Sequence, residues 1–536
     1  MFTLNYSTLR ALPYTSGSEF VFVQGYSSIG DGGEGIFFWD SSLTGVTDND
    51  GTIILYNGTS STGVWKRVYS GPVNVRWFGI SGSDNTTAIQ KAINATGKGI
   101  LYFPAGNYAI SATIILPDSI TVTGDGMNSS IINSSVTDFA FYYQAPAGLG
   151  TYEAPKFFKL QIHGYSGIKI NDVTKGFSDG SDSQQGYVMR PYIEEVNILG
   201  TNNTTIANGG IGIQWSKCFD GVINKCSVQS FDTGIDFQGS DLCTISNNRI
   251  FSPLVAAINL ISHTTFGSQT LVSHNDILSA RGGSYIISSD LDPKIEYNLF
   301  ERIPTGPTMN SVLKFLPPSY QVSVTDNRVD VASGIAPYWL DFSAITVSCL
   351  VTIRNNFTRG VTMGSLFLNA NGYPYWYNPT IKAVFIYSGN SREDGVPFNS
   401  QKQLPLSSNC VYLATPSTDG LTNNNYGLTL KCINNEFILP PIAAYGSSIT
   451  FRPGVTGLMN IYICCYADTA GQVLNYQRLN GTTVITQSTV ALTTTPTIYQ
   501  LYSNVSVSAL ALTFWNNDLT NNSSIRIQKV YVDQAI

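Results

Sequence analysis

The sequence predicts an all-β protein built around a parallel β-helix, with smaller β domains at both ends. Charged residues make up only 12% of the 536 residues, and aromatic residues supply another 12%. This composition can bury enough surface to fold. It also suits residues that stack on identical neighbours, where columns of like charge would repel. A repeat of about 20 to 30 residues, with a second column of strands that advances with it, completes the prediction.

Residues 1–75 are predicted to form a small β domain. "EFVFVQGYSSIGDGGEGIFFWD" contains two apolar strands around a Gly-rich turn, and "GTIILYNGTSSTGVWKRV" contains a second hairpin. A phosphate-binding loop at "GDGGEG" would need a helix directly after it, and the strand-like "IFFWD" follows instead. We therefore interpret this segment as a hairpin turn.

One convincing helix follows, in "SDNTTAIQKAINATGKG". Asp84 or Asn85 can cap its first turn, and Gly97 can end it. Its apolar residues recur with helical spacing on one face: Ala88, Ile89, Ala92 and Ile93. Because short strands begin directly after it, we predict that this helix caps the first coil, a coil being one turn of the β-helix.

A repeat of the form apolar-x-x-Asn-x-apolar predicts the parallel β-helix over residues 76–384. Its clearest members have their asparagines spaced 27, 23 and 29 residues apart: Asn248, Asn275, Asn298 and Asn327. Weaker members place other residues at this position: Val196, Cys226 and Asn355. Such a period, with three short strands in each repeat, is typical of a parallel β-helix. Asparagines stacked at an inward corner can hydrogen-bond to one another and to the turn backbone.

A second column of strands supports this register. "GIQW", "GIDF", "AINL", "VLKF" and "WLDF" alternate apolar and polar residues, one segment per coil. Trp215 and Trp339 in these segments are expected in the core.

Residues 385–536 lack the repeat and contain longer strands between polar turns, which predicts an antiparallel β-sandwich. Where the coils end, "NGYPYWYNP" (371–379) is expected to plug the open end of the helix.

The bulk properties exclude several classes of partner. A net charge of −6 and a pI near 5.2, without a Lys/Arg cluster, argue against nucleic acid. No apolar run reaches the ~18 residues of a membrane span and no signal-peptide pattern occurs, so we expect a soluble chain made in the cytoplasm. The eight cysteines include no CxxC pair and are expected to be free, packed thiols. Neither a cofactor nor a metal site is predicted.

Three segments together resemble the start of bacteriophage tailspike proteins with a pectate-lyase-like domain: "GYSSIGDGGEGIFFWD", "GVWKRVYSGPVNVRWFGI" and "DNTTAIQKAINATGKGILYFPAGNYAI". The resemblance covers roughly residues 10–126 by motif and the later coils by pattern. It implies a homotrimer of right-handed β-helices on a virion, joined to the phage tail, baseplate or another tail protein by the N-terminal domain. Such proteins bind a capsule or O-antigen polysaccharide and usually cleave it, and their C-terminal module trimerises or binds carbohydrate. Because the neck-like motif lies almost at the start of the sequence, we do not expect a full particle-binding head domain in it.

The register also predicts a charged surface patch beside the asparagine corner. Adjacent coils lie about 4.8 Å apart, so residues that point outward before and after each asparagine form columns. In a chain so poor in charge, one group of columns is unusually polar: Arg249, His274, Asp276, Tyr297, Glu301, Asp326, Arg328 and Asp330. We predict that this patch is the glycan site, and that four residues there and at its border bind substrate: Arg249, Arg328, Glu296 and Arg354.

Hydrolysis of a glycosidic bond is the reaction that we favour for this patch. It needs one protonated carboxyl and one carboxylate that activates water or attacks the sugar. Glu301 and Asp330 are expected on adjacent coils, where like charge would separate their pKa values. We predict Glu301 as the acid, with Asp330 or Asp326 as the base. His274 and Asp276 are expected to assist them.

β-Elimination at a uronic acid is the alternative reaction. It needs a base that takes the proton next to the carboxylate and a cation that holds the developing charge. His274 or Tyr297 could be the base. Arg249 or Arg328 could be the cation.

Less specific interpretations also stay open. The patch could consist of surface ion pairs of little energetic weight, such as Arg249 with Asp276. Another face carries a second polar column: Gln214, Asp236, Asn259, Lys314 and Asp341. Asp236, Glu194 or Glu296 could supply the acid instead. The chain could also be a receptor spike that binds glycan without cleaving it, or a free bacterial enzyme of the pectin-degrading type, and the site could lie between subunits.

Overall fold

The computed structural model describes residues 2–14, 20–147, 150–172, 186–201, 210–251, 255–262, 269–278, 284–301, 311–330, 338–341, 344, 350–359, 367–368, 384–388, 390–392, 397–398, 410–414, 421–423, 431–433, 436–439, 448–451, 457–480, 483–507, 510–516 and 524–534. The chain divides into two compact units, Met1–Lys314 with Asp330–Ala336, and Phe315–Val329 with Pro337–Ile536. Nearly all of the regular structure is β-strand, as the sequence predicted.

The N-terminal domain of the first unit is a five-stranded sheet in the order β1-β2-β3-β5-β4. Its strands are β1 (Phe2–Thr3), β2 (Phe20–Val23), β3 (Gly35–Asp40), β4 (Ile53–Ile54) and β5 (Val64–Arg67). β2 pairs antiparallel with β3 and β4 with β5, so both predicted hairpins are confirmed. A short helix that we did not predict, α1 (Tyr6–Arg10), is capped by Asn5 and buries Tyr6 and Leu9.

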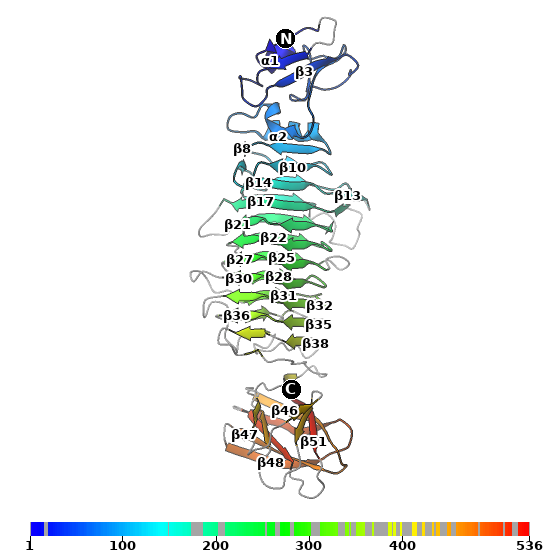
Figure 1. The fold of residues 1–536 in the computed structure, drawn as a ribbon, viewed down its shortest axis with the longest axis vertical. Helices are drawn as coiled ribbons and strands as arrows, with labels where there is room; N and C mark the ends of the chain where they lie inside the picture. Colours follow the sequence, from blue (N-terminus) through cyan, green and yellow to red (C-terminus); the bar gives the residue numbers. More distant parts are fainter. Residues whose placement is uncertain are drawn as a thin grey trace. The chain divides into compact units, whose positions relative to one another are not determined.

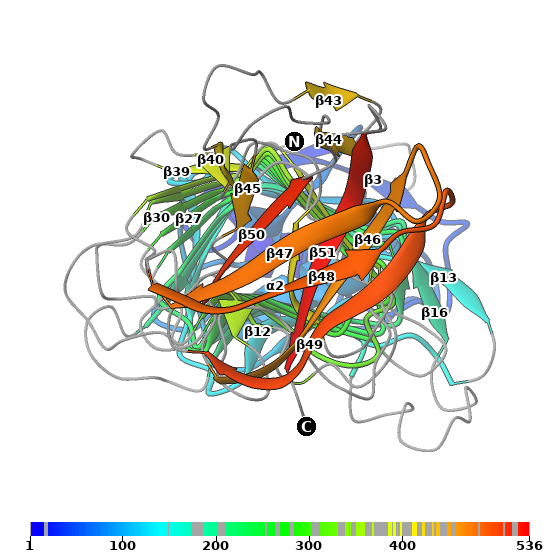
Figure 2. The ribbon, with the colours of Figure 1, turned by 90° about the horizontal axis from the view of Figure 1, so that it is seen from below.

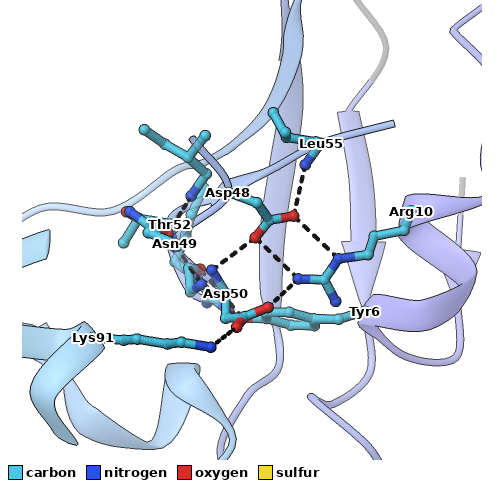
Figure 3. A network of polar contacts seen from close by, with 11 residues as sticks. Tyr6, Arg10, Asp48, Asn49, Asp50, Thr52, Leu55 and Lys91 are labelled. Atoms are coloured by element: carbon cyan, nitrogen blue, oxygen red, sulfur yellow. Dashed lines mark hydrogen bonds and ion pairs between the residues drawn. The ribbon is translucent and has the colours of Figure 1, made fainter. Parts of the chain in front are cut away.

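Charged side chains join this domain to the helix that caps the coils (Figure 3). Asp48 accepts two hydrogen bonds from Arg10 of α1, from Nε at 3.1 Å and from Nη2 at 3.0 Å. Asp50 forms ion pairs with both Arg10 and Lys91, and Lys91 lies on α2 (Thr86–Thr96). Because these side chains are partly exposed, each pair contributes only about 0.2–1 kcal/mol. The network therefore connects α1 to α2 through Asp50 and contributes little to stability.

The predicted capping helix is confirmed as α2. Gly97 follows its last turn with φ of 58°, and Ile89, Ala92 and Ile93 are buried. In the first turn, Asp84 Oδ1 accepts a hydrogen bond from the N–H of Thr86 at 2.9 Å. The first coils are built from β6 (Val73–Asn74), β7 (Ile100–Phe103), β8 (Gly106–Ile110), β10 (Thr121–Gly124) and β11 (Ser130–Ser134).

Parallel coils stack below α2 in the first unit (Figure 1). One sheet contains the strands that precede and follow the corner position in each coil. They are β14 (Lys156–Gly164), β17 (Tyr192–Gly200), β20 (Val222–Asn224), β21 (Ser227–Gln229), β23 (Thr244–Ser246), β24 (Arg249–Phe251), β26 (Leu271–Ser273), β27 (Asp276–Leu278), β29 (Lys294–Glu296) and β30 (Leu299–Glu301). A second sheet takes one strand per coil: β9 (Ile114–Ile115), β12 (Phe139–Tyr143), β15 (Ser166–Ile170), β18 (Ile211–Ser216), β22 (Thr233–Gln238), β25 (Ala256–Ile261) and β28 (Ser284–Ser288). We did not predict β28, because "SYIIS" lacks the alternation of its neighbours. A small third sheet contains β13 (Thr151–Glu153), β16 (Tyr187–Met189) and β19 (Cys218–Phe219).

The asparagine column is a buried hydrogen-bond ladder, as predicted. Asn248 donates from its backbone N–H and from Nδ2 to Oδ1 of Asn275, both at 3.0 Å, and Asn275 makes the same two bonds to Asn298 at 3.0 Å. The residue before the asparagine is in the left-handed region, with φ of 56° at His274 and 54° at Tyr297. The backbone turns sharply at this corner residue, whose side chain is exposed in both coils.

The second unit begins with further parallel coils. β32 (Gln321–Thr325) pairs with β35 (Leu350–Arg354), which pairs with β38 (Val384–Ser388), and β36 (Phe357–Arg359) pairs with β39 (Asn390–Arg392). Here Asn356, rather than Asn355, belongs to the ladder, because its Oδ1 accepts from Asn327 N–H at 2.9 Å and from Asn327 Nδ2 at 3.0 Å. Our assignment of Asn355 was wrong. The repeat requires an apolar residue two positions after the asparagine, and Phe357 meets this requirement for Asn355. In the structure, Thr358, two positions after Asn356, is buried instead.

An antiparallel sandwich follows the coils of the second unit, as predicted. One sheet has the order β43-β44-β51-β46-β49 and the other β42-β45-β50-β47-β48, and Figure 2 shows their long strands crossing. Between them lies a core that includes Ile463, Leu474 and Phe514. The strands are β42 (Leu421–Asn423), β43 (Lys431–Ile433), β44 (Glu436–Leu439), β45 (Ser448–Phe451), β46 (Gly457–Ala467), β47 (Val473–Asn480), β48 (Thr483–Ala491), β49 (Thr497–Val507), β50 (Leu510–Asn516) and β51 (Ile525–Gln534).

The remaining predictions about the core are tested only in part. Trp215 and Trp339 are fully buried, as expected. Five cysteines in the described residues are free and buried, which agrees with packed thiols: Cys218, Cys226, Cys243, Cys464 and Cys465. The expected plug at 371–379 lies outside the described residues. Within the part of the chain that the structure describes, no helix is long and apolar enough to span a bilayer.

Candidate functional site

The first unit contains a group of exposed and half-exposed residues that we name the corner patch: Arg249, His274, Asp276, Tyr297 and Glu301. β24, β27 and β30 stack in parallel, so that Arg249 pairs with Asp276, and Leu278 pairs with Glu301. His274 and Tyr297 are the corner residues that precede β27 and β30. The predicted columns are therefore confirmed for these residues, whereas their role as a site stays a prediction.

The corner patch contains a stacked pair of aromatic rings. The rings of His274 and Tyr297 are stacked, with centroids 5.0 Å apart and an interplanar angle of 21°. Tyr297 is 52% exposed. An amphipathic ring held by the backbone in this way can stack on the apolar face of a sugar while its polar edge stays in water.

Arg249 and Asp276 form a loose ion pair beside these rings. Arg249 Nε lies 3.9 Å from Asp276 Oδ2, and the side chains are 64% and 43% exposed. Pairs of this kind contribute about 0–1 kcal/mol. The pair is thus the weak surface ion pair that we considered as an alternative to a binding site. It leaves the guanidinium of Arg249 open to solvent, where an anionic ligand can reach it.

Glu301 is the exposed last residue of β30. The hydroxyl of Tyr285 donates to its backbone carbonyl at 2.7 Å, which holds the strand end while the carboxylate faces solvent. Asp330 is half-buried at the end of β33 (Arg328–Asp330). The pairing of the two carboxyls on adjacent coils stays a prediction.

Three predicted site residues belong to the second unit. Arg328 lies over the ring of Phe357, 5.5 Å from its centroid. The N–H of Asp326 donates to the carbonyl of Arg354 at 2.9 Å. Arg354 pairs in register with Thr325, not with Asp326, because the asparagine ladder shifts by one residue in this coil. The placement of Arg354 in the corner column was therefore wrong, and Asn355 holds that position with φ of 53°.

A third row runs beside the corner patch and contains the alternative acids Glu194 and Glu296. The register aligns it as Glu194, Asn224, Ser246, Ser273 and Glu296. Glu194 accepts hydrogen bonds from Asn224 Nδ2 at 2.9 Å, Lys225 Nζ at 3.2 Å and the Tyr192 hydroxyl at 3.2 Å. Burial alone would raise the pKa of Glu194, but these bonds outweigh it and lower the pKa. Glu194 is thus a stabilised carboxylate and a poor proton donor.

The one-strand-per-coil sheet carries a row of polar side chains that we name the outer ladder: Tyr142, Lys169, Gln214, Asp236 and Asn259. The register places these residues in line on β12, β15, β18, β22 and β25. They alternate along their strands with fully buried residues such as Ile213 and Ile235. Lys169 lies 5.4 Å from the ring centroid of Tyr142, so the upper part of the ladder combines a cation with an aromatic ring.

Asp236 is the centre of the outer ladder. Amide groups donate to its carboxyl from Gln214 at 2.8 Å, Asn259 at 2.7 Å and Gln238 at 2.7 Å, and the residue is only 4% exposed. Burial raises the pKa of Asp236, and the three amide bonds, which favour the charged form, do not outweigh it. Sequence reasoning kept Asp236 only as an alternative acid, although a carboxyl inside "GIDF" was a visible signal.

Asp290 is a buried carboxyl that sequence reasoning missed. Burial raises its pKa to about 7. Its carboxyl accepts hydrogen bonds from the N–H of Thr270 at 3.2 Å and of Asp292 at 2.9 Å, so it closes the turn after β28. "SSDLDP" resembles an ordinary solvent-exposed turn, and nothing in that pattern indicates burial. Among the residues that the structure describes, no group of three or more His, Cys, Asp or Glu could hold a metal ion.

Comparison with known proteins defines the class of this fold. Residues 72–283 match the family model "Rhamnogalacturonase A/epimerase, pectate lyase-like", and residues 3–70 match "Phage tail protein small four-stranded beta-sheet domain". No curated protein sequence matches the chain. The chain thus contains a segment similar to a phage tail β domain, followed by a segment similar to a pectate-lyase-like domain.

Solved structures extend the likeness to the whole chain. The tailspike protein of Acinetobacter phage vB_ApiP_P1 is similar with a TM-score of 0.54 and 14% identity, over 99% of this chain and 98% of that one. The tailspike protein of Acinetobacter baumannii phage AM24 is similar with a TM-score of 0.50 and 14% identity, over 99% of this chain and 94% of that one. At this identity the likeness concerns the fold. With the two matched domains, it confirms the resemblance to bacteriophage tailspike proteins.

Proposed function

We propose that this chain is a bacteriophage tailspike that binds a bacterial surface polysaccharide, a capsule or O-antigen, and cleaves it by endo-hydrolysis. The observation that carries the proposal is the succession of a phage tail β domain and a pectate-lyase-like β-helix in one chain. The first part is suited to attachment to a phage tail. The second offers a long solvent-exposed surface on which a polymer can lie.

The corner patch is our proposed catalytic region. Glu301 protonates the glycosidic oxygen, and Asp330 or Asp326 takes a proton from the attacking water. The ring of Tyr297 supports this proposal, because it is 52% exposed and a sugar ring can pack on it.

Charged neighbours complete the proposed corner site. Arg249 and Arg328 contact acidic or hydroxyl groups of the glycan, and Glu296 accepts hydrogen bonds from it. Asp276 keeps Arg249 near the rings through their 3.9 Å pair. Arg354, which pairs in register with Thr325, is proposed as a further contact to the glycan.

The outer ladder is a second location for the same reaction. A general acid must stay protonated at the working pH, and burial shifts the pKa of Asp236 in that direction. Gln214, Asn259 and Lys169 add donors of the kind that sugar hydroxyls and carboxylates accept. The two locations make opposite predictions for single substitutions.

Digestion of candidate capsules and O-antigens with the purified chain tests this proposal. Hydrolysis would produce new reducing ends without new ultraviolet absorbance. New absorbance from a double bond conjugated with a carboxylate would instead show elimination, with His274 or Tyr297 as base. Binding with unchanged polymer viscosity would show a receptor spike that does not cleave.

We further propose that the chain assembles as a homotrimer and is made in the host cytoplasm. Light scattering of the purified chain tests the assembly. A mass of three chains supports it, and a mass of one chain at all concentrations would favour a free enzyme. Co-purification with phage tails tests attachment through residues 1–75.

A further inference from the structure

The upper coils of the β-helix carry a group of polar side chains that we name the Glu194 network: Tyr192, Glu194, Asn224, Lys225 and Asn247. The Tyr192 hydroxyl and Lys225 Nζ both donate to the Glu194 carboxylate at 3.2 Å. Asn224 Nδ2 donates to the same carboxylate at 2.9 Å, and Asn247 Nδ2 donates to Asn224 Oδ1 at 2.9 Å. These bonds connect three successive coils and hold the carboxylate in one orientation.

The Glu194 network has hydrogen-bonding capacity left for a ligand. A carboxylate has about four acceptor positions, and Glu194 uses three of them within the described residues. Lys225 donates to Glu194 while its side chain is 57% exposed, and Asn247 is exposed as well. The network therefore presents an acceptor and donors side by side at the surface. A pair of sugar hydroxyls needs this combination, because each hydroxyl can both donate and accept.

Two aromatic side chains border the Glu194 network. Phe158 pairs in register with Glu194 on the adjacent coil. The ring of Phe158 stacks with that of Tyr192, with centroids 5.5 Å apart and an interplanar angle of 30°, and both side chains are partly exposed. Apolar carbon beside a fixed acceptor suits a pyranose, because its C–H groups can pack on the aromatic carbon while its hydroxyls meet the polar groups.

The row that contains Glu194 leads down the coils to Glu296 at the border of the corner patch. The register aligns Asn224, Ser246 and Ser273 between the two glutamates. Each step is one coil of about 4.8 Å, so the four steps cover about 19 Å. All three side chains between the glutamates are short, so a polymer that lies along this row can contact both ends of it.

We propose that the Glu194 network binds a neutral pyranose unit of the polysaccharide, about four coils away from the region where cleavage is proposed. The inference rests on the function proposed above and adds the chemical class of one unit of the substrate. A neutral unit fits because its hydroxyls can donate to Glu194, which the three hydrogen bonds keep charged by lowering its pKa. An anionic unit would be repelled there and fits the corner patch instead, where Arg249 is 64% exposed.

Titration of the full-length chain with labelled capsule or O-antigen polysaccharide tests this site. The variant is E194Q, which replaces the carboxylate by an amide of the same size, and we expect it to raise Kd roughly three- to tenfold without changing kcat. The control is E153Q, because Glu153 also pairs with a cation, Arg190, but lies on β13 of the third sheet. Its Kd should equal that of the wild type. Fragments of the polymer too short to span about 19 Å should bind the wild type and E194Q equally.

The sign of the change in Kd separates the outcomes. A lower Kd for E194Q than for the wild type would mean that an anionic unit lies at the network, and an unchanged Kd would mean that no unit does. Either result, or an equal rise in E153Q, overturns this inference and leaves cleavage at the corner patch intact. If the wild type binds no capsule or O-antigen, the proposed function fails and this inference fails with it. Circular dichroism and thermal unfolding of both variants show that a change in Kd is not a loss of fold.

Discussion

The corner patch and the outer ladder lie on the same β-helix and differ in almost every physical respect. The corner patch is exposed, and its ion pair of Arg249 with Asp276 joins side chains that are 64% and 43% exposed. The outer ladder is centred on a carboxyl that is 4% exposed and accepts three amide hydrogen bonds. Because the corner patch is exposed, a polymer can reach it, but solvent weakens its electrostatic interactions. Because Asp236 is buried, its pKa is raised, but a polymer has little access to it. The comparison shows that residue type alone does not locate a catalytic acid.

The largest expected effect distinguishes the two regions directly. Positioned acid–base groups contribute about 10²- to 10⁴-fold to rate. We therefore expect E301Q and D330N each to lower kcat by about that factor, and D236N to lower it by less than about tenfold. E195Q is the control, because Glu195 occupies the same corner column several coils away. Reducing-end assays on the polysaccharide provide the rates.

The reverse pattern would move catalysis to the outer ladder. In that case D236N abolishes turnover while E301Q and D330N cleave at the wild-type rate. Wild-type rates in all of these variants would exclude both regions as the source of the acid. Circular dichroism of each variant shows that a loss of rate is not a loss of fold.

Buried carboxyls should also make stability depend on pH, and Asp290 provides the clearest test. Its folded pKa of about 7 lies above the value in an unfolded chain, near 3.9. The folded state therefore binds the proton more tightly. The stability that this group contributes is fully present below the unfolded pKa and is lost as the pH rises through 7, by roughly 2–4 kcal/mol in total.

D290N removes this titration. Between pH 5 and pH 8 the wild type should lose stability relative to D290N, as measured by urea unfolding at several pH values. D276N is the control, because it makes the same chemical change at a carboxyl that is 43% exposed. Parallel curves for the wild type and D290N would contradict a raised pKa in the folded chain.

The asparagine ladder supports the corner patch, so its loss is the next largest effect. N275A leaves the N–H of Asn248 without its 3.0 Å acceptor and the carbonyl of Ile245 without a donor at 2.9 Å. We expect a loss of about 1–3 kcal/mol in the free energy of unfolding. N133A is the control, because Asn133 Nδ2 donates only one long, solvent-exposed hydrogen bond, to Asn107 Oδ1 at 3.4 Å. It should change stability by less than about 0.5 kcal/mol. Equal losses in both variants would mean that burial of the ladder contributes nothing.

The same ladder explains how much of the fold the sequence could predict. Asn248, Asn275 and Asn298 repeat because each must satisfy backbone groups in a buried corner, so the register could be inferred from the spacing alone. The inference failed at Asn355, where two asparagines are adjacent and the inward neighbour is Thr358 rather than an apolar residue. β28 was missed because "SYIIS" does not alternate.

The candidate site was less accessible to sequence reasoning. Stacking of His274 on Tyr297 follows from the register, since both are corner residues. The burial of Asp236 and Asp290 does not follow from it, because it depends on which neighbours cover an outward side chain. Periodicity reports the direction of a side chain. It does not report the solvent exposure that sets a pKa.

The smallest expected effect concerns the ion pair of the corner patch. R249A and D276A should each change the free energy of unfolding by less than about 1 kcal/mol, because the pair is solvent-exposed and its atoms are 3.9 Å apart. If the patch binds glycan, R249A should nevertheless raise KM several-fold while kcat changes little, since an exposed guanidinium can bind the ground state and the transition state equally. A substitution in the outer ladder that leaves the fold intact, K169A, is the comparison. A KM raised by K169A and not by R249A would show that the polysaccharide lies along the one-strand-per-coil sheet rather than across the corner.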